Sequence, residues 1–215
     1  MKVKWLGHAS FLITSQEGTR IITDPYKVVG GLSYDPVNES ADIVTVSHEH
    51  GDHNNTAGVA GNPDLVKGPG VTHARGIEFQ GIAAYHDASQ GKERGPDTIF
   101  CFTVDGIRLC HLGDLGAPLS TEQVKEIGKV DIVMLPVGGF YTIDAAVASS
   151  TLEALNPRVA LPMHYKTDKC SYPIAGVDDF LKGKKNVRRP GSTEVELTAD
   201  NLPRASEIIV LQHAL

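Results

Sequence analysis

Three histidines and one aspartate fall within a stretch of six residues, His48-Glu-His50-Gly-Asp52-His53. The stretch follows the apolar run Ile43–Val46, which predicts a buried strand, and the glycine and asparagines nearby predict a loop. Such a loop can arrange side chains around one point, and imidazole nitrogen and carboxylate oxygen are ligands of zinc, iron and manganese. A polar loop that is merely rich in histidine is the alternative. Because the chain has only 9 histidines in 215 residues, three in six positions favour a metal site.

Four further polar residues come directly after apolar runs that predict strands, namely Asp24, His86, Asp114 and His164. A single histidine at a strand end is more often a structural hydrogen-bonding group. Strand ends, however, meet at one edge of a sheet, where α/β proteins assemble their sites. Together with the six-residue motif, these positions predict a larger metal centre built from several strand ends.

Short β-like runs dominate the first half of the chain, and helical signals appear between and after them. The predicted strands cover Val3–Trp5, Ser10–Ile13, Arg20–Thr23, Ile43–Val46, Ile77–Phe79, Ile82–Tyr85, Thr98–Val104, Ile107–Leu112 and Ile132–Leu135. A capping-box pattern at Ser120-Thr-Glu-Gln123 and a capping Asp144 open two predicted helices. These helices continue to Ile127 and Leu155, and a last short helix is expected at Val177–Leu181. This order predicts a layered α/β protein.

A two-residue turn at Asp105-Gly106 predicts a hairpin between the strands on either side of it. The register of that hairpin places Cys101 directly opposite Cys110, so a cross-strand disulfide is geometrically allowed. We expect two buried thiols instead, because disulfides do not persist in a reducing cytoplasm.

Composition narrows the function classes. The chain carries 20 basic and 26 acidic residues, a formal charge of −6, which argues against a nucleic-acid surface. No run approaches the ~18–20 apolar residues that a membrane helix requires. The segment Gly7-His8-Ala9-Ser10 interrupts the only apolar start that resembles a signal peptide. We therefore expect a single cytoplasmic domain over residues 1–215.

On these residues the chain resembles the metal-dependent hydrolases of the metallo-β-lactamase fold. The family's HxHxDH motif matches His48, His50, Asp52 and His53, and its later ligands match His86, Asp114 and His164 in order. More narrowly, the chain resembles the branch typified by ascorbate-6-phosphate lactonase, in the stretches Trp5–Phe11, His111–Asp114, Leu135–Gly139 and Pro162–Tyr165. The resemblance implies an αββα four-layer sandwich of two mixed β-sheets flanked by helices, with the metals in a groove along one edge.

The resemblance also implies which residues hold two divalent metal ions. His48, His50 and His86 would bind the first ion, and Asp52, His53 and His164 the second, with Asp114 shared between them. Asp24 would orient a ligand imidazole. Zinc is the default metal for such a site, and manganese, iron or nickel fit the same ligands. Close relatives often carry a further histidine where this chain has Ala117.

The expected function is that of a dinuclear metal-dependent hydrolase. A hydroxide bridging the metals would attack a small anionic ester, lactone or phosphodiester, with Asp52 orienting it. Histidine at position 50, where the related di-iron oxygen reductases have glutamate, favours hydrolysis over redox chemistry. Tyr141 is a candidate proton donor and Lys166 a candidate anion-binding group. His8, His111 and Arg94 are further candidates.

Two alternatives stay open. A nucleic-acid phosphodiesterase is disfavoured by the negative charge and by the lack of a large insertion that could grip RNA or DNA. A metal-stabilised binding or regulatory protein without turnover is the other. We expect a small anionic substrate and neither nucleic acid nor membrane as a partner, while homo-oligomerisation is left open.

Overall fold

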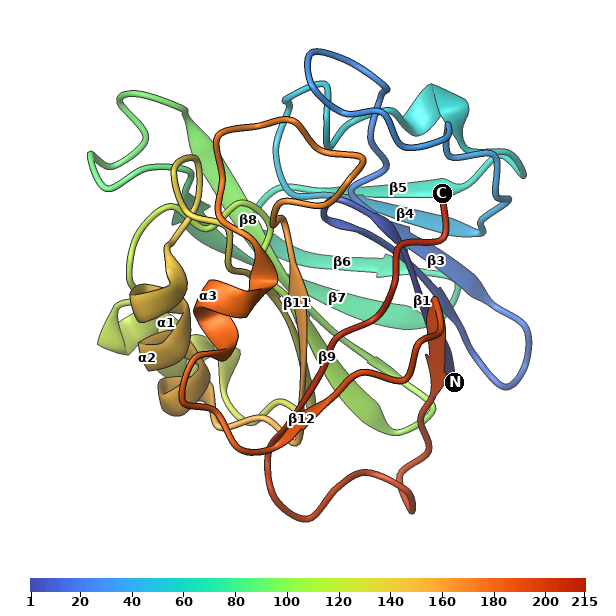
Figure 1. Cartoon of the computed structure of the whole chain (residues 1–215). Coiled ribbons are helices and arrows are strands. Elements are labelled where there is room, and N and C mark those ends of the chain that lie inside the picture. Colours follow the sequence, from blue (N-terminus) through green and yellow to red (C-terminus); the bar gives the residue numbers. More distant parts are fainter.

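Two β-sheets pack against each other in the computed structural model, which describes residues 1–215, and three α-helices lie on one side of them (Figure 1). The first sheet has the strand order β13-β1-β2-β3-β4-β5. Its strands are β1 (Lys2–Gly7), β2 (Ser10–Thr14), β3 (Arg20–Thr23), β4 (Ile43–Val46), β5 (Asp64–Lys67) and β13 (Glu194–Glu196).

The second sheet has the order β12-β14-β11-β10-β9-β8-β7-β6. Its strands are β6 (Gly70–Ala74), β7 (Ile77–Tyr85), β8 (Pro96–Val104), β9 (Ile107–His111), β10 (Ile132–Pro136), β11 (Val159–Met163), β12 (Val187–Arg188) and β14 (Glu207–Ile209). The helices are α1 (Thr121–Ile127), α2 (Ala145–Leu155) and α3 (Val177–Leu181), and a single 3-10 turn covers Thr56–Gly58. None of the helices is long and apolar enough to cross a membrane.

Strand direction brings the candidate ligands to one end of the sandwich. In the first sheet β1 and β3 are both antiparallel to β2, and β4 is parallel to β3, so β1, β3 and β4 run the same way. In the second sheet β9, β10 and β11 are parallel, and β7 shares their direction through β8. Within each sheet the carboxyl ends of these strands therefore lie at the same edge. Side chains from the two sheets can meet there.

Side chains of the first sheet alternate between two apolar cores. On β2, Phe11 and Ile13 face the main core between the sheets, whereas Leu12 faces a smaller one on the other side. The smaller core is closed by loop residues such as Tyr26 and Tyr34, so irregular chain covers the outer face of this sheet. Both faces of the sheet are buried, which fixes the strand ends that carry the site.

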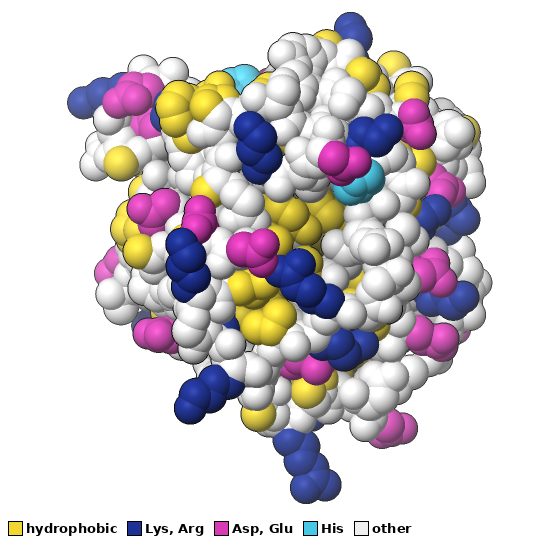
Figure 2. Space-filling view, in the orientation of Figure 1, with side chains coloured by type: hydrophobic (Ala, Val, Ile, Leu, Met, Phe, Trp, Pro, Cys, Tyr) yellow, Lys and Arg dark blue, Asp and Glu magenta, His cyan; other side chains and the backbone are white.

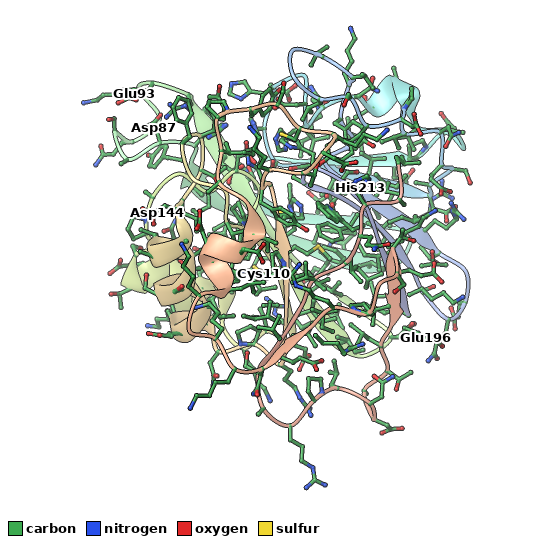
Figure 3. All side chains as sticks on the ribbon, viewed as in Figure 1. Asp87, Glu93, Cys110, Asp144, Glu196 and His213 are labelled. Atoms are coloured by element: carbon green, nitrogen blue, oxygen red, sulfur yellow. The ribbon has the colours of Figure 1, made fainter.

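The α/β class with two mixed sheets is confirmed, and so are the three helices. The Ser120 hydroxyl accepts from the Gln123 amide at 3.1 Å, and Gln123 Oε1 accepts from the Ser120 amide at 2.9 Å, which is the predicted capping box. Cys101 pairs with Cys110 across the hairpin, and both are free thiols in the interior; Cys110 is labelled in Figure 3. The runs at 77–79 and 82–85 are one continuous strand, β7, rather than two.

Candidate metal centre

A single carboxylate oxygen lies at the middle of the centre. Asp114 Oδ2 is 3.1 Å from His53 Nε2, 3.1 Å from His86 Nε2 and 3.3 Å from His164 Nε2. These three imidazoles follow three different strands, β4, β7 and β11, so the contact joins the two sheets. A carboxylate with imidazoles on several sides is what a ligand shared between two metals requires.

Two groups of histidines flank Asp114. The candidate ligand nitrogens of His48, His50 and His86 lie within 4.8 Å of one another, and those of His8, His53 and His164 do the same. The first group contains the three residues that the family resemblance assigns to the first metal. The second contains two of the three assigned to the second metal, with His8 in addition.

Asp24 interacts with both groups of histidines but belongs to neither of them. Its carboxylate accepts hydrogen bonds from the Ser47 amide at 2.8 Å, from the Ser47 hydroxyl at 2.5 Å and from His53 Nδ1 at 2.9 Å. Ser47 Oγ in turn lies 2.9 Å from His48 Nδ1. With their Nδ1 atoms engaged in this way, His53 and His48 direct Nε2 towards other candidate ligands, Asp114 and His50, so Nε2 is the atom available to coordinate a metal. These contacts are consistent with the orienting role that the family resemblance implies for Asp24.

The residues of the centre fit a divalent metal. Several buried polar atoms have no hydrogen-bond partner, namely His8 Nε2, His53 Nε2, His86 Nδ1, His164 Nδ1 and Asp114 Oδ1. An unpartnered buried polar atom costs about 1–3 kcal/mol, so such a cluster within one centre indicates a ligand. Imidazole and carboxylate together are the donor set of zinc and similar ions.

Electrostatics point the same way. Burial opposes ionisation of Asp114, yet the charges of His164 and His53 hold the pKa of its carboxyl well below the usual value. Burial, followed by the charge of His164, lowers the pKa of His8 to about 4, so its imidazole is neutral. Although burial alone would lower the pKa of His53, Asp114 and Asp24 raise it well above the usual value. A proton on His53 therefore balances two buried carboxylates, a role that a bound cation would take over.

A cavity of about 350 Å³ opens onto the centre. Five of its lining residues are candidate ligands, and the other three are Arg94, Tyr141 and Tyr172. The Arg94 guanidinium carbon lies 5.7 Å from the centroid of the Tyr141 ring, which is a cation–π contact. The cavity thus combines a metal-binding floor with one cation and two phenol hydroxyls on its wall.

The loop that carries Arg94 connects β7 to β8 and is organised by Asp87 (Figure 3). The Asp87 carboxylate accepts hydrogen bonds of 2.7–3.1 Å from four backbone amides, those of Ser89, Gly91, Glu93 and Arg94. One buried carboxylate therefore fixes the loop immediately after His86 and holds the backbone of Arg94 at the cavity wall.

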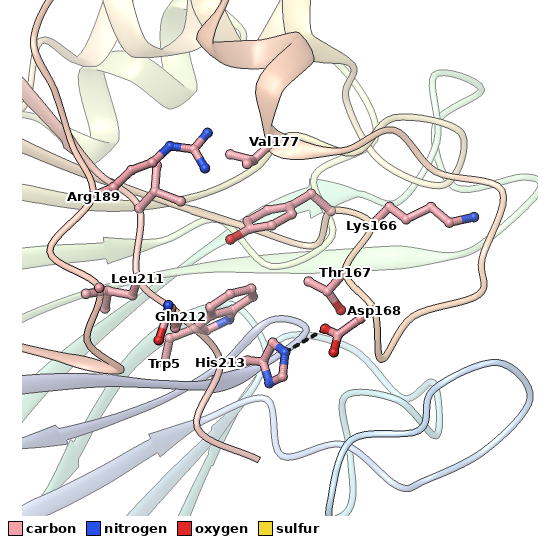
Figure 4. A pocket seen from close by; sticks show the side chains of 12 residues that line it. Trp5, Lys166, Thr167, Asp168, Val177, Arg189, Leu211, Gln212 and His213 are labelled. Carbon is pink, nitrogen blue, oxygen red and sulfur yellow. Dashed lines mark hydrogen bonds and ion pairs between the residues drawn. The ribbon is translucent and has the colours of Figure 1, made fainter.

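The structure brings all seven predicted ligands to this centre, but it separates the predicted substrate residues. Asp52 and Tyr141 line the cavity, whereas Lys166 lies in a different hollow of about 480 Å³ (Figure 4). Lys166 donates a hydrogen bond to the Tyr172 carbonyl at 3.2 Å. His111 lies inside the sheet, where Nε2 donates to the Ala9 carbonyl at 2.8 Å.

The hollow that contains Lys166 is visible on the face shown in Figure 2, with apolar side chains on its floor and charged ones on its rim. Two of its basic groups are paired with carboxylates: His213 Nε2 lies 2.9 Å from Asp168 (Figure 4), and Arg189 pairs with Asp178. It holds no second cluster of ligand residues. The chemistry is therefore concentrated at Asp114.

Tyr172 is the lining residue that the sequence does not predict. Its hydroxyl lies 3.5 Å from Asp52 Oδ2, and it comes from the irregular segment between β11 and α3. No local pattern marks it. His8, by contrast, comes directly after β1, as the predicted ligands come directly after their strands. Its position at a strand end is therefore a sequence signal that could have grouped it with them.

Comparison with known proteins gives a consistent result. Residues 2–164 match the family described as the beta-lactamase superfamily domain. A UPF0173 metal-dependent hydrolase of Archaeoglobus fulgidus is 30% identical, with 86% of this chain and 91% of that protein covered. One from Carboxydothermus hydrogenoformans is 31% identical, covering 83% and 88%. A solved structure of a candidate Zn-dependent hydrolase of the metallo-β-lactamase superfamily from Thermotoga maritima matches with a TM-score of 0.80 and 36% identity, covering 98% and 97%.

Proposed function

The chain belongs to the metal-dependent hydrolases of the beta-lactamase superfamily, and from this membership we propose that it is a dinuclear enzyme acting on a small anionic ester, lactone or phosphodiester. The observation that carries the proposal is the position of Asp114 Oδ2, within 3.1–3.3 Å of imidazoles from both histidine groups. A single-metal site would need only one of those groups.

His48, His50 and His86 would hold one ion and His53, His164 and Asp52 the other, with Asp114 between them. Bound there, two divalent ions would lower the pKa of a coordinated water and act as Lewis acids on the substrate. The protein itself orients the ligand imidazoles. Asp24 and Ser47 keep the imidazoles of His53 and His48 in the tautomers that present Nε2.

Asp52 orients the attacking water. Burial alone would raise the pKa of its carboxyl, but the His8 imidazole, whose Nε2 lies 3.4 Å from Oδ2, and the charge of His53 lower it well below the usual value. A carboxylate that stays ionised accepts a hydrogen bond from water and is a weak base. The Tyr172 hydroxyl, 3.5 Å from Oδ2, limits the directions in which Asp52 can point.

Arg94 and Tyr141 bind the substrate. A guanidinium is charged at every physiological pH and pairs with carboxylate or phosphate oxygens in a fixed fork geometry. Tyr141 lies beside it, and its hydroxyl has no partner within the protein, so it is free to donate to a developing oxyanion or a leaving group. A cavity of about 350 Å³ suits a compact molecule.

Metal-free protein titrated with zinc or manganese tests the proposal. Each addition is followed by the metal content per chain and by hydrolysis of bis-nitrophenyl phosphate, anionic aryl esters and a lactone panel. We expect activity to rise until two ions are bound. Asp114→Asn should lose metal and activity, whereas Asp168→Asn, which alters an exposed carboxylate outside the cavity, should retain both.

Two results would overturn the proposal. Full activity with a single bound ion would exclude the dinuclear mechanism. Failure of the fully loaded protein to cleave any compound of the panel would exclude the substrate class. Cleavage of single-stranded RNA or DNA in place of the small molecules would instead support the nucleic-acid phosphodiesterase alternative.

A further inference from the structure

The hollow that Lys166 lines is built in the same way as the metal centre. Strands β11, β14 and β12 run parallel, and Tyr165, Val210 and Arg189, which follow their carboxyl ends, all line the hollow of about 480 Å³ (Figure 4). The metal ligand His164 also follows β11, so both sites lie at one edge of the second sheet. They share no lining residue. Such an edge is where α/β proteins bind small molecules, so the hollow is a candidate for a second binding site.

The floor of the hollow is apolar and preformed. Five residues form it, each at most 8% exposed, namely Trp5, Tyr165, Val177, Val210 and Leu211. The ring centroids of Trp5 and Tyr165 are 5.1 Å apart, and the Trp5 indole donates a hydrogen bond of 3.1 Å to the His8 carbonyl, which fixes the ring from behind. A floor that is already ordered accepts a compact apolar group without the cost of rearrangement.

One polar group on this floor lacks a partner. The hydroxyl of Tyr165 forms no hydrogen bond within the protein, although the residue is only 6% exposed and lines the hollow. Burial raises the pKa of this hydroxyl, so it stays protonated and remains a hydrogen-bond donor. Buried tyrosine hydroxyls usually have a partner. A donor left free on an apolar floor therefore indicates a ligand that supplies an acceptor.

Arg189 places a positive charge beside that hydroxyl. Whereas burial raises the pKa of Tyr165, the charge of Arg189 acts in the opposite direction. Arg189 pairs with Asp178, but both side chains are more than half exposed, and an exposed pair of this kind is weak. A guanidinium has five N–H donors, so Arg189 can also bind a carboxylate of a ligand in the hollow.

The other charged groups of the lining are already engaged. Lys166 donates a hydrogen bond of 3.2 Å to the Tyr172 carbonyl, and the carboxylate of Asp168 lies 2.9 Å from His213 Nε2. Arg189 is therefore the cation of the hollow that is most available to a ligand.

We propose that this hollow binds a small molecule that consists of a compact apolar body and one carboxylate. The apolar body packs on the floor around Trp5, and the carboxylate accepts hydrogen bonds from the Arg189 guanidinium and the Tyr165 hydroxyl. A volume of about 480 Å³ lies within the usual range for small-molecule pockets. The site is separate from the metal cavity, so the inference does not depend on the dinuclear centre proposed above.

Trp5 is the only tryptophan of the chain, so its fluorescence reports on the floor of the hollow. The zinc-loaded protein is titrated with isocaproate, phenylacetate and hydrocinnamate, and with the corresponding uncharged amides. We expect a saturable change in fluorescence with the carboxylates and about 10–100-fold weaker binding of the amides. No saturable change with any of these compounds would overturn the proposal. Equal affinity for acids and amides would overturn the role of the carboxylate.

Substitutions locate the bound carboxylate. Arg189→Gln should weaken its binding by about 10–100-fold and Tyr165→Phe by about 2–10-fold, with the affinity for the amides little changed by Arg189→Gln. Arg188→Gln is the matched control, because this neighbouring arginine pairs with Glu207 and does not line the hollow. It should bind the carboxylates as the wild type does. Equal affinities in Arg189→Gln and Arg188→Gln would overturn the proposal.

Arg94→Gln separates the hollow from the metal cavity. Arg94 lines the cavity and not the hollow, so its substitution should leave the fluorescence titration unchanged. Weaker binding in Arg94→Gln, with wild-type binding in Arg189→Gln, would show that the carboxylates bind at the metal centre and would overturn the second site.

Discussion

The carboxylate of Asp24 accepts a hydrogen bond of 2.9 Å from Nδ1 of His53, and neither side chain is exposed to solvent. This pair fixes the tautomer of a ligand imidazole, and loss of such a partner lowers metal affinity by about 10–100-fold. We expect that loss in Asp24→Asn, measured by competition of the protein with a chromogenic chelator.

Asp200→Asn is the matched control, because Asp200 is exposed and outside the centre. It should bind metal as the wild type does. Equal affinity in Asp24→Asn and Asp200→Asn would show that the carboxylate of Asp24 does not orient the imidazole.

Arg94 supplies the only cation on the wall of the metal cavity. A hydrogen bond to a charged group contributes about 1.5–3 kcal/mol, so Arg94→Gln should raise KM for an anionic ester by about 10–100-fold. Because the metal ligands are unaltered, KM for an uncharged ester of the same leaving group should change little. Steady-state kinetics on the two esters measure the difference.

Lys166→Gln is the informative comparison for that experiment. Lys166 lines the neighbouring hollow, so its removal should leave KM for the anionic ester close to the wild-type value. A larger effect from Lys166→Gln than from Arg94→Gln would restore the anion-binding role that the sequence suggests for Lys166.

The fold is predictable wherever burial produces a pattern. The bounds of β3 and β4 coincide with the apolar runs 20–23 and 43–46, because both strands lie inside the first sheet and are almost wholly buried. The edge strands β5 and β6 were missed. Leu65 on β5 is 48% exposed and Val71 on β6 is 61% exposed, so these segments are extended by pairing with a neighbour and not by an apolar pattern of their own.

The ligand residues of the site are predictable for the same reason. Prediction of the other site residues fails where the chain is irregular. The ligands follow the carboxyl ends of buried strands, so sequence alone brings them together. Lys166 lies only two residues after His164, but its amide pairs with the Ala175 carbonyl and its side chain leaves the cavity. Tyr172 reaches Asp52 across the fold from an irregular segment, a contact that depends on tertiary packing alone.

Glu39 makes stability depend on pH away from the metal centre. Its carboxylate accepts hydrogen bonds from Lys4 at 2.8 Å and from Arg20 at 2.7 Å, and these lower its pKa. A folded-state pKa below the unfolded one gives stability that is complete above the unfolded pKa and is lost as pH falls through the folded one. Glu39→Gln should thus lower the free energy of unfolding at pH 7 by up to about 1 kcal/mol.

Urea unfolding of metal-free protein measures this effect, with Glu17→Gln as the control at an exposed position. The difference between wild type and Glu39→Gln should shrink as the pH falls below the ordinary glutamate pKa, while Glu17→Gln should follow the wild type throughout. A difference that is constant between pH 7 and the acid limit would show that the carboxylate contributes no charge interaction.

Gly116 lies against the backbone of a metal ligand. Its amide donates to the Tyr85 carbonyl at 2.9 Å, and a Cβ at this position would collide with the carbonyl group of His86 and the amide of Asp87. Its φ is not positive, so alanine is disfavoured by this collision and not by the backbone conformation. The collision must displace His86 or the loop that follows it.

Gly116→Ala should therefore destabilise the protein by about 1–3 kcal/mol and weaken the ion held by His48, His50 and His86 more than the other. Gly176→Ala is the matched control: the cap of α3 has φ = −76°, and a Cβ there would meet nothing within 4 Å. It should retain both ions. Chelator competition resolves the two sites. Equal weakening of both ions by Gly116→Ala would mean that the substitution perturbs the centre as a whole, and that the backbone at Gly116 does not set the position of His86.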